Sequence, residues 1–132
     1  MAVVLTKPKL YLGVDFSEVE SFHIAGGTAC AFTGRAPGKE TGNEDALGLV
    51  PCGESACALV VADGLGGLPS GEQASSTAVK QVSQNITASC SEQLVLREAI
   101  LDSIEQANKL IMERGAGSGT TIIAVEIENH TV

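Results

Sequence analysis

Basic side chains are scarce in this sequence. Its 132 residues include 8 Lys and Arg against 16 Asp and Glu, which gives a formal net charge of -8 at pH 7. Proteins that bind the phosphate backbone of nucleic acids depend on Lys and Arg to release its counterions, so we expect no nucleic acid among the partners. The acidic surplus itself leaves two interpretations open: it keeps a small domain soluble, or some of its carboxylates bind cations.

Long apolar runs are also missing. A membrane-spanning helix needs about 18 or more consecutive apolar residues, and the sequence contains no such segment. The first residues, MAVVLTKPKLYLGVDF, turn polar too early for a secretory signal. We therefore expect no association with a membrane and a cytoplasmic location.

The cysteine pattern lacks the spacing that marks a zinc site. None of the four cysteines forms a C-x-x-C pair, and only His23 and His130 are available to complete a set of ligands. We predict buried free thiols in a reducing compartment, in preference to a zinc site or a disulfide framework. The four residues are Cys30, Cys52, Cys57 and Cys90.

The length and composition that are present fit one domain over residues 1–132. A hydrophobic fraction of 44% with 18% charged residues is typical of a globular chain. Apolar segments separated by glycine and proline predict strands, and apolar residues at helical spacing predict two helices. Two consecutive helices after a run of strands favour an α+β fold over alternating β-α-β units. The strands are expected at 10–14, 22–32, 46–50, 57–62 and 120–128, and the helices at 70–89 and 91–114.

The segment VVADGLGG places one acid at the end of an apolar strand and follows it with glycines. Asp63 therefore has a fixed backbone position, and the glycines let carbonyl groups and a ligand approach closely. Carboxylate and carbonyl oxygens are the ligands that Mg²⁺ and Mn²⁺ prefer. The segment thus predicts a site for a hard cation, and an ordinary Asx turn at Asp63 is the alternative.

A second acidic segment, N-E-D, directly precedes the strand at 46–50. If that strand pairs antiparallel with the strand at 57–62, Glu44 and Asp45 come near Asp63. Three carboxylates in one place are unfavourable without cations, so this arrangement predicts metal ions more strongly than a single acid does. A solvated acidic turn is the alternative.

Four short motifs occur in a fixed order along the chain. They are N-E-D-A at 43–46, A-D-G-L-G-G and G-E-Q-A-S within 62–75, and G-S-G-T-T at 117–121. As an ordered set they resemble the type 2C, metal-dependent (PPM) protein serine/threonine phosphatases, over nearly the whole chain. The resemblance implies an αββα sandwich, in which two antiparallel sheets lie between helix layers and metal ions sit at one end of the sheets. The chain matches the N-terminal part of that catalytic domain, so we expect a partial sandwich that lacks the later strands.

The resemblance also implies a role for each matching residue. Asp63 would bridge two Mn²⁺ or Mg²⁺ ions, Gly64 would offer its carbonyl to one of them, and Glu44 would lie on that ion or in its water shell. Asp45 would orient the metal-bound water. The implied reaction is hydrolysis of phosphoserine or phosphothreonine in a phosphoprotein by a metal-bridging water, without a covalent intermediate.

The sequence departs from the family pattern at three points. Leu65 follows the D-G pair where some members carry His. The arginine that grips phosphate usually lies four residues before the metal-shell Glu, where this chain has Glu40, and Arg35 or Lys39 are the candidates to replace it. The two later metal-ligand aspartates of the family are the third departure, since the sequence ends where they would begin. A non-catalytic regulatory module or a truncated fragment on the same scaffold therefore stays open as the alternative function, and the unpaired edge of the strand at 120–128 predicts self-association.

Overall fold

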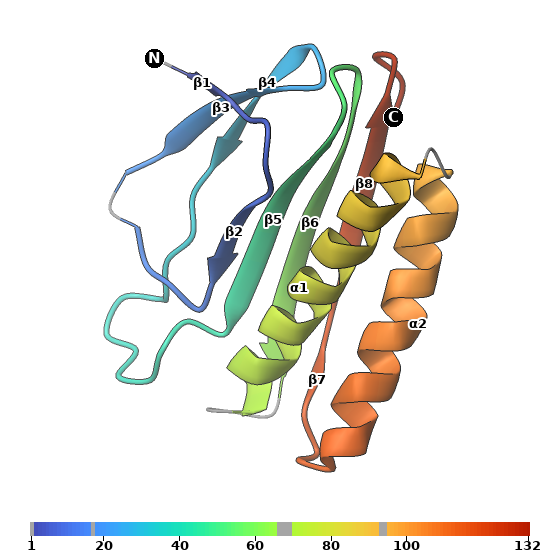
Figure 1. Ribbon diagram of the computed structural model, residues 1–132. Coiled ribbons are helices and arrows are strands. Elements are labelled where there is room, and N and C mark those ends of the chain that lie inside the picture. The colour runs from blue at the N-terminus through green and yellow to red at the C-terminus, as the bar shows by residue number, and fades with distance from the viewer. Residues whose placement is uncertain (1, 17, 66–69, 93–94) are drawn as a thin grey trace.

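The computed structural model describes residues 2–16, 18–65, 70–92 and 95–132 (Figure 1). Two consecutive helices follow a run of strands, which confirms the α+β class. The glycine turn expected at 66–69 lies outside the described residues. In chain order the elements are β1 (Val3–Val4), β2 (Lys9–Leu12), β3 (Glu20–Ile24), β4 (Gly27–Ala31), β5 (Asp45–Cys52), β6 (Ala56–Leu65), α1 (Ser70–Ser91), α2 (Leu96–Arg114), β7 (Gly119–Thr120) and β8 (Ile123–Glu128).

The strands form two sheets that pack face to face. The larger sheet has the order β2-β5-β6-β7, with β8 also paired to β6, and the strands pair antiparallel throughout its described residues. The smaller sheet has the order β1-β3-β4. Both helices cover one face of the larger sheet, and the smaller sheet covers its other face (Figure 1). Within the described ranges the chain thus forms three successive layers, helix, sheet and sheet, of the expected four-layer sandwich.

Strand alternation divides the core between the two faces of the larger sheet. In β6, Ala58, Val60 and Ala62 are buried against the helices, whereas Cys57 and Leu59 pack toward the smaller sheet. The small side chains let α1 lie close to the sheet. As predicted, α1 presents a buried stripe at four-residue spacing, which consists of Ala74, Ala78, Val82 and Ile86.

The structure corrects two of the predicted strands. The segment expected as one strand at 22–32 is a hairpin, because the chain reverses at Ala25 and Gly26, which have φ angles of 51° and 76°. A positive φ at a non-glycine residue is uncommon, so the sequence carries little signal for this turn. The strand expected at 120–128 is likewise divided into β7 and β8. The second helix starts at Leu96 and not at 91.

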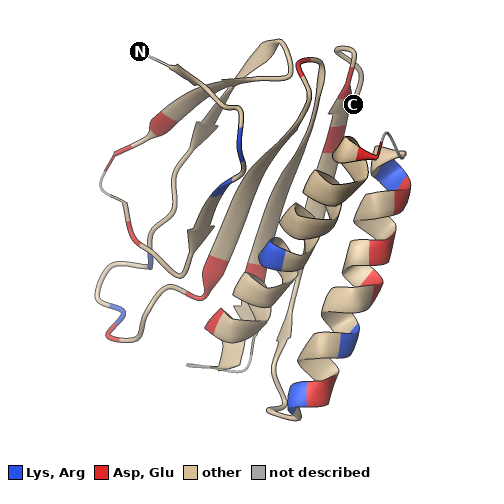
Figure 2. Cartoon of the chain, in the orientation of Figure 1, with Lys and Arg blue, Asp and Glu red and all other residues tan. Residues whose placement is uncertain are grey.

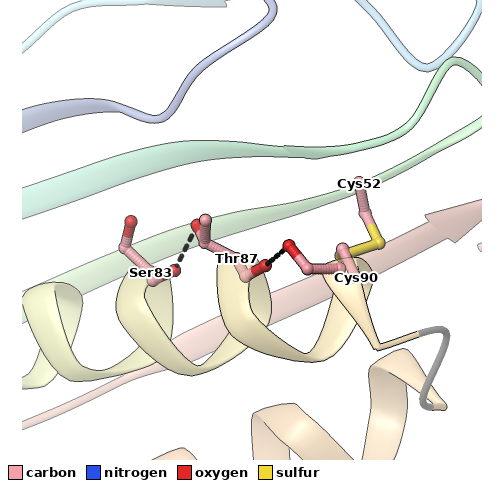
Figure 3. The surroundings of a disulfide bond; sticks show 5 residues. Cys52, Ser83, Thr87 and Cys90 are labelled. Carbon is pink, nitrogen blue, oxygen red and sulfur yellow. Dashed lines mark hydrogen bonds between the residues drawn. A yellow bond between two sulfur atoms is a disulfide. The ribbon is translucent and has the colours of Figure 1, made fainter.

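The prediction of four free thiols was wrong. Cys52, at the end of β5, forms a disulfide with Cys90 in the last turn of α1, with the Cα atoms 5.5 Å apart (Figure 3). Such a pairing depends on where α1 ends over the sheet, and a sequence separation of 38 residues gives no local signal for it. Cys57 is a buried free thiol, as predicted, and Cys30 is free but exposed.

Charged residues lie mainly on the outer side of α2, in the loops and at the end of the larger sheet where β5 begins (Figure 2). Neither of the two helices in the described ranges has an apolar stretch that is long enough to cross a membrane.

Candidate metal and phosphate site

Asp45 and Asp63 form the centre of the candidate site. They are direct partners across antiparallel β5 and β6, at the first residue of β5. Directly paired residues have their side chains on the same face of a sheet, so both carboxylates lie on one side. Asp45 is half-buried and Asp63 is exposed. The structure therefore confirms that the two acidic segments come together by antiparallel pairing.

The environment of Asp45 favours its protonated form. Burial raises the pKa of the Asp45 carboxyl above its ordinary value of 3.8, and the negative charge of Asp63 and a hydrogen bond shared with Asp63 raise it further. The positive charge of Lys39 acts in the opposite direction. A cation bound between the two carboxylates would remove this mutual repulsion.

Glu44 is held in place through its backbone carbonyl, and its side chain points toward Lys39. The Glu44 carbonyl oxygen accepts hydrogen bonds from the Gly64 N–H, at 3.1 Å, and from the Ser75 hydroxyl, at 2.6 Å. The carboxylate forms an ion pair with the Lys39 ammonium, at 3.1 Å. Glu44 thus joins β6 and α1 through its carbonyl, while its side chain faces Lys39.

The backbone of Gly64 lies against the first turn of α1 at Gly71. A Cβ atom on Gly64 would lie 2.1 Å from the Gly71 carbonyl oxygen, so no larger residue fits there without moving the helix. A Cβ atom on Gly71 would lie 3.3 Å from Glu44 Oε1 and 3.4 Å from the Gly64 carbonyl oxygen. The missing side chain of Gly71 therefore leaves a space that two of the predicted metal donors face.

The donor set fits a hard divalent cation in part. The available atoms are carboxylate and carbonyl oxygens, which suit Mg²⁺ and Mn²⁺. Asp45 and Asp63 are both acidic, so a cation between them would be attracted by both. The expected convergence of three carboxylates is not realised, because Glu44 pairs with Lys39. Among the residues the structure describes, no group of three or more His, Cys, Asp or Glu side chains is placed to hold a metal ion.

The G-S-G-T-T motif holds the backbone of Asp63, a role that sequence reasoning missed. The Asp63 N–H donates to the Thr121 hydroxyl, at 3.2 Å, and the Thr121 N–H donates to the Asp63 carbonyl oxygen, at 2.9 Å. The Thr120 hydroxyl also donates to that carbonyl oxygen, at 3.0 Å. The two threonines therefore fix the position of the Asp63 backbone near the end of β6.

Asn43 is a second residue whose role the sequence did not reveal. Its side chain is buried, and its amide donates to the Val14 carbonyl oxygen and to the Thr33 hydroxyl, each at 2.9 Å. Its Oδ1 atom accepts a hydrogen bond from the Asp45 N–H, at 3.0 Å. Asn43 thus ties two loops to the first residue of β5, and only its place in the N-E-D-A motif marks it in the sequence.

The two candidate phosphate ligands lie in different surroundings. Lys39 reaches the site through its ion pair with Glu44. The Arg35 guanidinium is paired with Asp15, at 3.3 Å, and donates to the Thr41 carbonyl oxygen. Leu65, which follows the D-G pair, is exposed.

A cavity of about 810 Å³ lies at the other end of the sheets and contains none of the predicted site residues. It is lined mainly by the β3–β4 and β5–β6 turns, with His23 and Glu54 among its polar residues. Its size alone gives no reason to place the chemistry there, since the carboxylates lie where β5 begins.

The comparison with protein families agrees with this geometry. The chain combines an α+β fold of two mainly antiparallel sheets with two carboxylates that pair at one end of the larger sheet. The model of the protein phosphatase 2C family matches residues 37–128, so the chain belongs to that family. The family is generally metal-dependent and acts on proteins. Comparisons with the curated proteins and with the solved structures gave no match.

Proposed function

We propose that this chain hydrolyses phosphoserine and phosphothreonine in proteins with the help of Mn²⁺ or Mg²⁺. The observation that carries the proposal is the direct pairing of Asp45 with Asp63 at the end of the larger sheet. This pair lies inside the segment that matches the protein phosphatase 2C family. The chemistry of such a pair, two crowded carboxylates on a fixed backbone, favours divalent cations.

In this proposal the Asp63 carboxylate and the Gly64 carbonyl would hold the divalent ions. Glu44 would bind one of these ions or a water in its shell. When bound, the ions supply an acidified water and neutralise charge on the phosphoryl group. Asp45 would orient the metal-bound water from its place directly opposite Asp63 in the sheet.

Lys39 and Arg35 are the proposed ligands of the substrate phosphate. Lys39 lies beside Glu44 and needs only a movement of its flexible side chain to face a phosphate near the carboxylate pair. Arg35 has to leave Asp15 first. We therefore propose Lys39 as the main phosphate ligand and Arg35 as a secondary one.

A non-catalytic regulatory module, or a fragment that needs a further segment, is the second candidate. The absence of a group of three or more metal-binding side chains from the described part of the chain favours it. On this alternative the scaffold folds and binds partners, but it does not hydrolyse phosphate esters.

We also propose that the chain associates with itself through β8. One side of β8 pairs with β6, and the neighbouring Val61 and Ile123 side chains are 51% and 65% exposed. A strand edge beside exposed apolar side chains favours pairing with another strand. Light scattering should give a mass that rises with protein concentration, and a constant monomer mass at high concentration would refute the proposal.

A cytoplasmic location is a further proposal that rests on the sequence alone. The Cys52–Cys90 disulfide makes this proposal testable, because disulfides are rare in a reducing cytoplasm. Trapping of free thiols in intact cells measures the oxidation state of this pair. Free thiols at both positions would support a cytoplasmic location, and an intact disulfide would contradict it.

The phosphatase proposal is tested by Mn²⁺-dependent hydrolysis of p-nitrophenyl phosphate and of a phosphothreonine peptide. Loss of a group that hydrogen-bonds to a metal ligand commonly lowers activity by about 10–100-fold, so Asp63→Asn, which alters a proposed direct ligand, should lower the rate at least that much. Glu54→Gln, an exposed acid in the β5–β6 turn, is the matched control and should keep the wild-type rate. A folded wild-type chain without activity would instead support the regulatory module.

A further inference from the structure

The Lys39 ammonium forms an ion pair with a carboxylate of the candidate site, that of Glu44. Its ammonium lies 3.1 Å from Glu44 Oε2, and the two side chains are 33% and 19% exposed. The described residues form three other ion pairs, and each of these is more exposed over its two side chains. Coulomb attraction is screened less at a partly buried pair than at an exposed one, so this pair has more effect on the site than ordinary surface pairs do.

The charge of Lys39 reaches beyond Glu44. Asp45 lies next to Glu44 in the chain, and the Lys39 charge lowers the pKa of its carboxyl while Asp63 and Glu44 raise it. One ammonium therefore offsets negative charge on Glu44 and on its chain neighbour Asp45.

The loop that carries Lys39 allows its side chain to move. The Lys39 N–H donates to the Ala36 carbonyl oxygen in a turn, and Gly38 in that turn has a φ of 78°. The backbone of Lys39 is thus fixed at the turn, whereas its ammonium sits at the end of a flexible four-carbon chain. The ammonium can leave Glu44 while the turn stays in place.

We propose that Lys39 is a tethered counter-cation, which occupies Glu44 beside the Asp45–Asp63 pair until a divalent ion displaces it. The proposal rests on the phosphatase function proposed above, and it adds a regulatory step to metal binding. A divalent ion and an ammonium repel each other at one carboxylate, so the ion must displace Lys39 from Glu44. The released ammonium stays within reach of the site, where it is available to an anionic phosphate group.

The first test is titration of the metal-free chain with Mn²⁺ by calorimetry. Removal of one positive charge about 4 Å from a site for a divalent ion changes the affinity by about thirty-fold where the surroundings are water-like, so Lys39→Gln should lower the Kd for Mn²⁺ by up to about that factor. Lys39→Arg keeps the charge and should stay near the wild-type Kd. Lys80→Gln removes a lysine from the exposed side of α1 and is the matched control. A Kd for Lys39→Gln that is unchanged or higher overturns the proposal.

The second test needs no metal and separates this proposal from the phosphatase function. Urea denaturation of the metal-free chain is compared for Lys39→Gln, Glu44→Gln and the double variant, in low salt. We expect Lys39→Gln to destabilise the chain less when Glu44 is already neutral, and the coupling to shrink as salt is added. Additive effects overturn the counter-cation role. A wild-type chain that binds no Mn²⁺ overturns the proposed phosphatase and the displacement step with it, whereas coupling in the denaturation cycle still supports Lys39 as the counter-cation of Glu44.

Discussion

Asp45 and Asp63 face the same side of the larger sheet as direct partners across β5 and β6. Each carboxylate has a fixed origin, because Asn43 holds the N–H of Asp45 and Thr121 holds the backbone of Asp63. The two strands and these hydrogen bonds therefore fix the positions of both residues. The two carboxylates repel each other in the folded chain when both are ionised. Several measurable effects follow from this arrangement.

The first prediction concerns the pH dependence of stability in the presence of a chelator. The pKa of Asp45 is raised above 3.8 in the folded chain, so folded Asp45 binds its proton more tightly than unfolded Asp45 does. This contribution to stability is complete below the unfolded pKa and is lost as the pH rises through the folded pKa. Asp45→Asn should therefore be more stable than wild type at pH 7, by about 0.5–1 kcal/mol as for other like charges opposed in a sheet. The gain should shrink toward pH 3, and urea denaturation across this range measures it.

The matched control for that experiment is Glu54→Gln, which neutralises an exposed acid in the β5–β6 turn. It should change the free energy of unfolding little at any pH. Equal pH profiles for Asp45→Asn and wild type would show that the carboxylates do not repel each other.

The second prediction concerns the contact between Gly64 and Gly71. A Cβ atom at Gly64 would lie 2.1 Å from the Gly71 carbonyl oxygen, so Gly64→Ala must push α1 away from β6. We expect a loss of about 1–3 kcal/mol in the free energy of unfolding, as for other overpacked sites. Gly119→Ala, where a Cβ atom meets no other atom within 4 Å, is the control. Similar melting temperatures for the two variants would contradict the close approach.

The third prediction concerns the disulfide. Closing a loop over a separation of 38 residues stabilises a fold by about 2–4 kcal/mol, chiefly through the unfolded state. Reduction, or the Cys52→Ser and Cys90→Ser double variant, should lower the free energy of unfolding by that amount, whereas Cys30→Ser should leave it unchanged. Thiol titration of the denatured, unreduced chain should find only the thiols of Cys30 and Cys57. Four reactive thiols would contradict the pairing.

The fourth prediction concerns Asn43. Asn43→Asp keeps the oxygen that accepts from the Asp45 N–H, but it removes the two hydrogen bonds that the amide donates to Val14 and Thr33. Unsatisfied buried partners cost about 1–3 kcal/mol, so the variant should unfold at correspondingly lower urea concentration. Asn108→Asp, on the exposed side of α2, should have little effect. Equal unfolding midpoints for the two variants would show that the Asn43 contacts are not needed.

Much of this fold could be predicted because its signals are local. The stripe from Ala74 to Ile86 has helical spacing, and the apolar segments that became β5 and β6 are bounded by polar residues and turns. The approach of Asp45 to Asp63 followed from a single assumption, that these two strands pair antiparallel. Strand pairing fixes which residues face each other, so the centre of the site was accessible from the sequence.

The remaining features depend on contacts between distant segments. The Glu44 carbonyl oxygen is held by Gly64 and Ser75, which lie 20 or more residues further along the chain, so no local pattern encodes the position of Glu44. The Cys52–Cys90 disulfide depends in the same way on where α1 ends over the sheet. The anchoring of Asp63 by Thr121 joins two motifs whose partnership only the folded chain reveals.

The measurement that tests the central claim most directly is binding of Mn²⁺ to the metal-free chain, followed by the electron paramagnetic resonance signal of free Mn²⁺. The paired carboxylates predict saturable binding that Asp63→Asn weakens by about 10-fold or more, as expected for loss of a charged oxygen ligand. Glu54→Gln should bind as wild type does. Identical binding curves for wild type and Asp63→Asn would contradict the assignment of the Asp45–Asp63 pair as a metal site.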